Sequence, residues 1–209
     1  MDCTRLVAIR HGQTAWNAEW RLQGQTDIAL DALGRQQAAR LADALRHEGL
    51  AAVVSSDLGR ALETAQALAG PLGLPVVIDA GLRERSFGIL EGCTRTDIDA
   101  RWPDLARRWF AREPDFAPEG GETLIDLRRR CLAAVQRQVQ AHAGQAIALV
   151  SHGGVLDCLY RAATGLALQV PRSWPMRNAA INRLLHSGQG QGLSLVGWDD
   201  HAHLDGLTA

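Results

Sequence analysis

Apolar residues in this chain gather in short unbroken runs, each of which gives way to polar or glycine residues. The runs lie at residues 6–9, 51–54, 76–78 and 147–150. Such runs are typical of parallel strands that are buried on both faces. The pattern therefore predicts four strands inside a sheet that is covered on both sides.

Apolar residues at helical spacing occupy the stretches between these runs. Helical periodicity is found in residues 34–48, 58–70 and 124–139. In the first of these, Ala38, Leu41, Ala42 and Leu45 follow i, i+3, i+4 and i+7 spacing. The polar residues 55–57 precede the second helix, and we expect their side chains to cap it. The alternation predicts a three-layer α/β/α fold with a mostly parallel central sheet and a small helical lid insertion.

One segment, residues 92–118, departs from this alternation. Trp102, Leu105 and Trp109 can share one face of a helix there. The segment is either an ordinary surface helix with a buried aromatic stripe or a lid over the binding edge. We expect a single domain over residues 1–209, with the lid-like insertion at about 92–118.

A glycine-rich stretch at residues 188–192 separates two short apolar runs near the end of the sequence. The pattern predicts a hairpin at an edge of the sheet. It does not fit a dinucleotide-binding fingerprint, because its third glycine is misplaced and no helix is expected after it.

Composition limits the setting of the protein. The 209 residues are 46% hydrophobic and carry a formal net charge of −1, so a sizeable core is expected and no general attraction to nucleic acid or membrane. The four cysteines show no CxxC spacing, which favours a reducing compartment. The first strand begins too early for a signal peptide, and no apolar stretch reaches membrane-spanning length. We expect a soluble cytoplasmic protein.

Two similar tripeptides follow directly after predicted strands. Arg10-His11-Gly12 follows the run at residues 6–9, and Ser151-His152-Gly153 follows the run at residues 147–150. Ligands of open α/β sheets bind at the carboxyl ends of the strands. We therefore expect both histidines at one binding edge.

Further motifs extend these tripeptides along most of the chain. They are Trp16-Asn17, Gln23-Gly24, Asp27, Ser55-Ser56-Asp57 with Arg60, Leu82-Arg83-Glu84, Phe87-Gly88, Glu91-Gly92, Gly120-Gly121-Glu122-Thr123, Gly154, Asn178-Ala179-Ala180-Ile181 and His203-Leu204. In this order they resemble the histidine phosphatase superfamily, also called phosphoglycerate mutase-like proteins. The resemblance implies a phosphatase that hydrolyses a small-molecule phosphate ester.

Phosphoryl transfer explains the residue types in these motifs. Neutral imidazole is a good nucleophile for phosphorus, so His11 suits the formation of a phosphohistidine. Arg10 and Arg60 carry forked, permanently charged donors for phosphate oxygens, and His152 can donate another hydrogen bond. Glu84 is the expected general acid for the leaving group, and then the base that activates water. The resemblance implies the same five roles.

Some assignments rest on the resemblance rather than on spacing. Spacing alone does not choose Glu84 over Glu91 or Glu63 as the general acid; the family pattern favours Glu84 and suggests that Glu91 braces a loop. Asn17, Gln23, Gly24 and Gly153 could be turn residues, but the resemblance implies that they surround the phosphate. We expect them to bind the substrate.

Two rival phosphatase chemistries fit the sequence poorly. Cys131 and Arg137 have the Cys-x5-Arg spacing of cysteine phosphatases, but the residues between them continue a helix and contain no glycine. The acidic and histidine residues at 199–203 lack partner ligands elsewhere for a metal. We expect neither a metal nor another cofactor.

Hydrolysis and phosphoryl transfer to a second substrate share the phosphohistidine step. Gly154 and Glu91 stand where mutases of the family typically carry asparagine and glutamine, and the segment between Glu84 and His152 looks shorter than in mutases. Arginines that could bind a substrate carboxylate are present in the proposed lid at Arg95, Arg101, Arg107 and Arg108. We favour a phosphomonoesterase over a mutase, and over a non-catalytic binding protein.

The sequence does not name the substrate. Trp102, Trp109 and Trp174 could form an aromatic wall for a nucleoside-like or other bulky phosphate, although packing in the core explains them better. The expected partner is a small phosphate ester, and the sequence predicts no oligomeric state.

Overall fold

The computed structural model describes residues 3–187 and 192–207. Its strands are β1 (Cys3–Arg10), β2 (Leu50–Ser55), β3 (Val76–Ile78), β4 (Ala146–Ser151), β5 (Ile181–Ser187) and β6 (Leu193–Asp200). Its helices are α1 (Ala15–Ala18), α2 (Ala32–Ala44), α3 (Gly59–Leu72), α4 (Arg95–Arg101), α5 (Pro103–Phe110), α6 (Leu124–Ala141) and α7 (Gly153–Thr164). Short 3-10 turns are η1 (Ala80–Leu82), η2 (Gly88–Leu90) and η3 (Ala202–Leu204).

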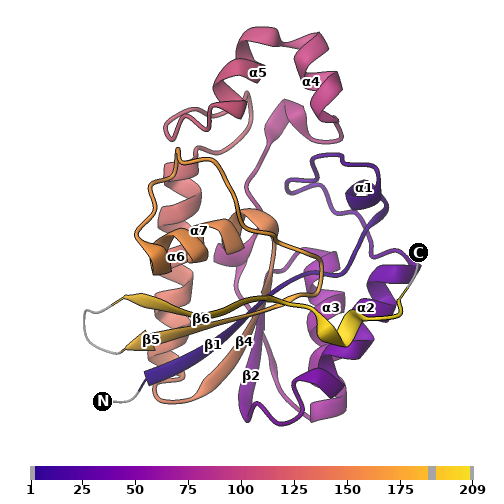
Figure 1. Ribbon diagram of the computed structural model, residues 1–209, viewed down its shortest axis with the longest axis vertical. Helices are drawn as coiled ribbons and strands as arrows, with labels where there is room; N and C mark the ends of the chain where they lie inside the picture. Colours follow the sequence, from indigo (N-terminus) through magenta and orange to yellow (C-terminus); the bar gives the residue numbers. More distant parts are fainter. Residues whose placement is uncertain (1–2, 188–191, 208–209) are drawn as a thin grey trace.

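The central sheet has the order β3-β2-β4-β1-β5-β6. The first four strands in this order are parallel, while β5 is antiparallel to β1 and β6 is antiparallel to β5. Helices α6 and α7 cover one face and α2 and α3 cover the other (Figure 1). The predicted α/β class and the mostly parallel sheet are confirmed.

Strand β1 shows why its apolar run is unbroken. Leu6 and Ala8 belong to the core under α6 and α7, whereas Val7 and Ile9 belong to the core under α2 and α3. Successive strand residues point to opposite faces, so a strand that is covered on both sides needs apolar residues throughout. The unbroken run therefore places β1 in the middle of the molecule, with β4 and β5 on either side and a hydrophobic core on each face.

Pairing of β1 with β4 brings the two histidines together. Arg10 lies opposite Ser151 in the register, and the amide of His11 donates a hydrogen bond of 2.9 Å to the carbonyl of Ser151. The imidazole rings of His11 and His152 are 5.2 Å apart between centroids. Both histidines lie at one edge of the sheet, as predicted.

The predicted capping of α3 is wrong. The residue before the helix is Leu58, which has no side-chain capping bond, and residues 55–57 lie upstream. The amide of Gly59 instead donates to the Asp27 carboxylate at 2.9 Å. A carboxylate from a distant loop thus takes the place of a local cap, because the chain at residues 26–27 packs against the start of α3.

Residues 92–118 form a separate small layer. Helices α4 and α5 stand beyond the carboxyl edge of the sheet, at the top of Figure 1. Trp102 lies at the junction of the two helices, and it packs with Leu105 and Trp109 on a small core around Leu90 and Ile98. The aromatic stripe is therefore partly buried against this core, and the movement of a lid stays a prediction.

The C-terminal strands β5 and β6 pair antiparallel at the sheet edge, as the hairpin prediction requires. Most of the predicted turn, residues 188–191, lies outside the described residues. No helix within the described parts of the chain is long and apolar enough to cross a membrane.

Candidate active site

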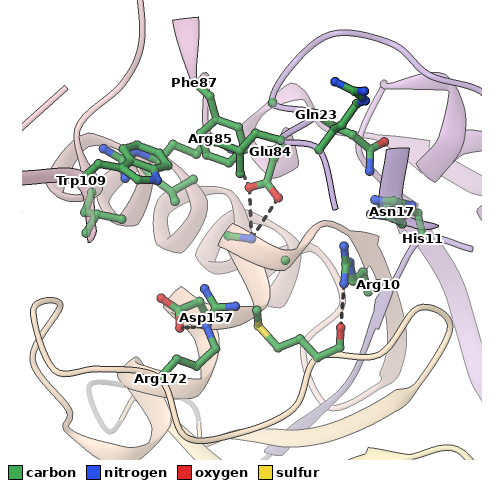
Figure 2. A pocket seen from close by; sticks show the side chains of 18 of the residues that line it. Arg10, His11, Asn17, Gln23, Glu84, Arg85, Phe87, Trp109, Asp157 and Arg172 are labelled. Carbon is green, nitrogen blue, oxygen red and sulfur yellow. Dashed lines mark hydrogen bonds and ion pairs between the residues drawn. The ribbon is translucent and has the colours of Figure 1, made fainter. Parts of the chain in front are cut away.

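A cavity of about 330 Å³ lies between the carboxyl edge of the sheet and the layer formed by α4 and α5. The predicted site residues that line it are Arg10, His11, Asn17, Gln23, Gly24, Arg60, Glu84 and Gly153. His152 is completely buried directly before Gly153. The fold thus brings together, around one cavity, residues that are far apart in the sequence (Figure 2).

The tautomer of His11 is set by the backbone. Its Nδ1 lies 2.7 Å from the Gly12 carbonyl, which can only accept, so Nδ1 carries the proton. Burial lowers the pKa of His11 well below 6.5, and the charges of Arg60 and Arg10 lower it further. The imidazole is therefore neutral, with the lone pair on Nε2, where Arg60 Nε donates at 3.3 Å.

The ring of His152 contacts Ser56. Its Nε2 lies 2.9 Å from Ser56 Oγ, and that oxygen also accepts from the Leu58 amide at 3.3 Å. When the serine hydroxyl donates its proton to Nε2, the ring proton of His152 lies on Nδ1. Among the described residues, this buried Nδ1 has no hydrogen-bond partner. Burial also lowers the pKa of His152 well below 6.5, so a neutral donor is available beside His11.

Two arginines, the buried Arg60 and the half-buried Arg10, supply the positive charge of the site. Arg60, in the first turn of α3, is 1% exposed and donates to the carbonyls of Gly24 at 2.7 Å and Thr26 at 2.9 Å. Arg10 donates to the Met176 carbonyl at 2.8 Å, while its buried Nε has no partner in the described structure. Burial lowers the pKa of Arg10 to about 10, which still leaves it cationic at neutral pH. The site therefore holds uncompensated donors for an anion.

Glu84 lies on the loop after η1 and faces the start of α7. Its carboxylate accepts from the Arg85 amide at 2.7 Å and, through both oxygens, from the Gly154 amide at 3.1 Å (Figure 2). A Cβ atom at position 154 would lie 2.2 Å from Glu84 Oε1. Gly154 is therefore the residue that lets the carboxylate approach the helix amide.

The loop that carries Glu84 is fastened by a residue the sequence analysis missed. Arg130 of α6 donates to the carbonyls of Gly81 at 3.0 Å, Arg83 at 2.7 Å and Glu84 at 2.8 Å. It also pairs with Glu122 at 2.7 Å. No local motif marks this arginine, because the three carbonyls that it binds belong to a loop more than forty residues away.

The competing glutamates lie elsewhere. Glu91 accepts from the backbone amides of Gln25 at 3.0 Å, Thr26 at 3.0 Å and Phe87 at 3.1 Å, so it braces the loop next to the cavity. Glu63 pairs with Arg35 at 2.7 Å on the surface. Of the three glutamates considered from sequence, Glu84 alone lines the described cavity.

The polar residues of the first loop surround His11. Asn17 Oδ1 accepts from the Thr14 amide at 3.2 Å and from Asn178 Nδ2 at 3.1 Å, which leaves the Asn17 amide nitrogen as a donor at the cavity. Asn178 also donates to the His11 carbonyl at 2.8 Å. The buried Oε1 of Gln23 has no partner in the described structure.

The far wall of the cavity consists of residues that no sequence motif marked. Arg112 Nη2 lies 2.6 Å from Asp157 Oδ2, and Arg172 Nε lies 3.3 Å from Asp157 Oδ1 (Figure 2). Arg85 donates to the carbonyls of Glu122 at 2.7 Å and Phe116 at 2.9 Å. These arginines are isolated in sequence, and only the fold brings them to one wall.

The lid arginines proposed from sequence do not reach this wall. Arg107 pairs with Asp104 and Arg108 with Glu113, while Arg95 stacks on Phe110 and Arg101 lies beside Cys93. None of the four lines the cavity. On α5, which carries Arg107 and Arg108, it is Trp109 and Phe110 that line the cavity instead.

The proposed aromatic wall is likewise only partly correct. Trp109 lines the cavity together with Phe87 and Phe110, but Trp102 does not. Trp174 stacks on Tyr160 at 4.1 Å between ring centroids and is buried.

No group of three or more histidine, cysteine or acidic residues in the described chain could hold a metal ion. Cys131 is fully buried within α6, and Arg137 pairs with Asp79 at 3.0 Å. The Cys-x5-Arg spacing therefore forms no phosphate-binding loop.

A sequence model of the histidine phosphatase superfamily (branch 1) matches residues 6–199. The chain belongs to this superfamily. It is 37% identical over 208 residues to phosphoglycerate mutase-like protein 4 of Arabidopsis thaliana, covering 98% of this chain and 89% of the relative. It is 40% identical over 183 residues to glucosyl-3-phosphoglycerate phosphatase of Mycolicibacterium vanbaalenii, covering 84% and 80%. It is 36% identical over 209 residues to the probable phosphoglycerate mutase GpmB of Yersinia pestis, covering 96% and 95%.

Solved histidine phosphatases share the whole fold. Bacillus stearothermophilus YhfR superposes with a TM-score of 0.88 at 34% identity, covering 97% of this chain and all of the other. Mycobacterial glucosyl-3-phosphoglycerate phosphatase in complex with VO3 gives 0.85 at 36% identity, covering 94% and 99%. Entamoeba histolytica phosphoserine phosphatase with 3-phosphoglyceric acid gives 0.84 at 26% identity, covering 96% and 99%.

Proposed function

We propose that this histidine phosphatase family member is a metal-independent phosphomonoesterase that works through a phosphohistidine on His11. The observation that carries the proposal is the state of His11: a neutral imidazole with its lone pair on Nε2, which accepts from Arg60 Nε beside a cavity lined by Arg10 and Arg60. Nucleophilic attack on phosphorus needs this lone pair, and the dianionic phosphoryl group needs fixed positive charge.

In the first step, His11 Nε2 forms a bond to phosphorus while the ester P–O bond breaks. Arg10 Nε donates to the phosphoryl oxygens, together with His152 Nδ1 and the Asn17 amide nitrogen. The hydrogen bond from Arg60 Nε to His11 Nε2 is released as the lone pair attacks, and Arg60 Nε then donates to a phosphoryl oxygen. The other donors are in place before substrate arrives, so little further reorganisation is required in the transition state. Glu84 gives its proton to the departing alkoxide, which leaves as the alcohol.

In the second step, water replaces the alcohol. Glu84, now ionised, takes a proton from the water as its oxygen attacks phosphorus, and the P–N bond to His11 breaks. Inorganic phosphate leaves, while His11 returns to its neutral form and Glu84 to its protonated form. One ester and one water are thus converted to one alcohol and one phosphate.

Transfer to a second substrate hydroxyl is the alternative, because two of the relatives are called a mutase or mutase-like. Hydrolysis is favoured because the arginines of the far wall already have hydrogen-bond partners within the protein. Arg85 is bound to two carbonyls and Arg112 to Asp157 and the Leu168 carbonyl at 3.0 Å. They are not free to bind a second phosphate, which a bisphosphorylated intermediate would require. The relatives named as phosphatases support the same choice.

The test is hydrolysis of p-nitrophenyl phosphate by the purified protein in the presence of excess chelator. Turnover is expected with chelator, and no turnover is expected for His11→Ala. A mutase assay with 3-phosphoglycerate and a bisphosphoglycerate primer is run beside it. Activity that survives His11→Ala, activity that chelator removes, or mutase turnover that exceeds hydrolysis would each overturn the proposal.

A further inference from the structure

A second, larger cavity adjoins the first. It measures about 780 Å³ and lies between the loop after α1, the start of α2 and the C-terminal segment around η3. Arg10, Asn17, Arg172 and Met176 line both cavities, so one continuous surface leads from the phosphate site outward. The second cavity is more than twice the size of the first, and its walls carry Trp16 and Trp20.

Trp20 occupies an unusual backbone position. Its φ is +58°, in the left-handed region that bulky residues rarely adopt. The Trp20 amide donates to the Asn17 carbonyl at 3.2 Å, and the Arg21 amide donates to the Trp16 carbonyl at 2.9 Å. This is the hydrogen-bond pattern of a Schellman motif, in which glycine is the usual residue at the left-handed position. Local structure therefore disfavours tryptophan here.

A second Schellman motif in the chain shows what normally offsets this strain. Arg112 has a φ of +55° after α5, with the Glu113 amide donating to the Arg108 carbonyl at 3.3 Å. Its side chain is only 17% exposed and is fixed by Asp157 and the Leu168 carbonyl. Trp20, in contrast, is 86% exposed. Contacts of the Arg112 side chain stabilise the folded protein and can offset the backbone strain. The exposed Trp20 ring makes almost no such contacts.

The charged residues around the second cavity indicate which kind of ligand group it could bind. Arg21 pairs with Glu19 at 2.6 Å, Arg172 pairs with Asp157, and Arg177 pairs with Asp199. Each of these three cations already has a carboxylate partner. Arg10 also lines this cavity, and its Nε, which is free among the described residues, is assigned to the phosphoryl group. A neutral group therefore fits this cavity better than a second anion, and an exposed indole offers a flat apolar face for stacking.

We propose that the second cavity binds the alcohol portion of the substrate, and that Trp20 stacks on a neutral ring in it, either a sugar or an aromatic ring. This inference rests on the proposed phosphatase function. The substrate class is then a phosphate monoester whose ring lies beyond the ester oxygen, and a compact acyclic ester would leave the cavity unfilled.

The test compares substrates with and without such a ring. The acyclic ester is glycerol 3-phosphate; the ring-bearing esters are adenosine 5′-monophosphate and a glucosylated glycerol 3-phosphate. Wild type should prefer at least one ring-bearing ester by tenfold or more in kcat/KM. Trp20→Ala and Trp20→Gly should each reduce this preference about fivefold, the size of one aromatic contact, while kcat/KM for glycerol 3-phosphate stays within twofold.

Two controls separate binding from folding. Val196→Ala removes an exposed apolar side chain from β6, outside both cavities, and should leave the preference unchanged. Trp20→Gly should melt at a higher temperature than Trp20→Ala, because glycine relieves the left-handed strain. A wild type without ring preference, or a preference that both Trp20 variants retain, overturns this inference alone. Failure of wild type to hydrolyse any ester overturns the proposed function with it.

Discussion

The two ends of the first cavity, our proposed catalytic site, are built differently. The proposed phosphate end, at Arg10, His11, Arg60 and the buried His152 beside them, comes from two strand ends and the first turn of a helix. The leaving-group end, where we propose that Glu84 protonates the ester oxygen, comes largely from loops and from the layer beyond the sheet. Its other residues are Arg85, Trp109, Arg112, Asp157 and Arg172. Elements of the core fix the first end, while long-range side-chain contacts such as those of Arg130 fix the second.

In the proposed mechanism, this difference separates the phosphoryl chemistry that all substrates share from the protonation of a particular leaving oxygen, while the second cavity would hold the rest of the alcohol. The phosphoryl group is the same in every phosphate ester, and rigid donors at strand ends suit it. The alcohol varies between substrates, and loops change more easily than a buried sheet. Substitutions at the phosphate end should therefore affect every substrate equally, and those at the leaving-group end should discriminate between them.

The largest effect is expected for Arg60→Ala. The loss of a buried charged donor should lower kcat/KM by about 10²–10³-fold, with similar factors for p-nitrophenyl phosphate and for an alkyl phosphate. Arg60→Lys, which keeps the charge but not the fork, should recover only part of the activity. Circular dichroism checks that both variants fold. A loss that depends strongly on the leaving group would contradict a role confined to the phosphate.

Glu84→Gln should show the opposite pattern. An alkyl phosphate needs a proton on its leaving oxygen, so its kcat/KM should fall by about 10²–10³-fold, whereas p-nitrophenyl phosphate should lose less than about tenfold. Glu63→Gln is the matched control, because Glu63 pairs with Arg35 outside the cavity. Equal losses on both substrates would mean that another group protonates the leaving oxygen.

Gly154→Ala should have a smaller effect of the same kind. The added methyl group would lie 2.2 Å from Glu84 Oε1, so the carboxylate must move away from the helix amide. We expect about a tenfold loss on an alkyl phosphate and little change on p-nitrophenyl phosphate. Gly70→Ala serves as the control, since a Cβ at that helical position meets nothing within 4 Å. Unchanged alkyl phosphatase activity in Gly154→Ala would show that Glu84 tolerates displacement.

The smallest effect concerns pH. Burial lowers the pKa of His11 and of His152, so both imidazoles should remain neutral as the pH falls through 6.5, and protonation should reduce nucleophilicity only at a lower pH. Nitrogen-15 NMR of the imidazoles, assigned with His11→Ala and His152→Ala, measures this directly. Protonation of His11 near its ordinary pKa would contradict the electrostatics described for the phosphate end.

The contrast between the two ends also explains what the sequence could predict. The apolar runs before Arg10-His11 and before Ser151-His152 predict two buried parallel strands, whose carboxyl ends lie at one edge of the sheet. His11 and His152 could therefore be placed together from local patterns. Arg112 and Arg172 could not, because nothing in their neighbourhood indicates that both reach Asp157. The same reason led to the wrong choice of Arg107 and Arg108, which form surface pairs.

Backbone strain at two helix ends is visible in the structure but leaves no pattern in the sequence. Trp20 and Arg112 both hold left-handed backbone positions, yet each is an ordinary tryptophan or arginine in the sequence. Only the hydrogen bonds of the two helix ends show that glycine would fit better, and only the exposure of Trp20 shows that its ring lacks a packing role.

The central claim is that His11 carries the phosphoryl group, and trapping this intermediate tests it most directly. The protein is mixed with a phosphorus-32 labelled ester, quenched within milliseconds and mapped by mass spectrometry. We predict an acid-labile, base-stable label on His11, which builds up further in Glu84→Gln if water activation is slowed. Rapid hydrolysis with no label on His11, or with the label on another residue, would contradict the account.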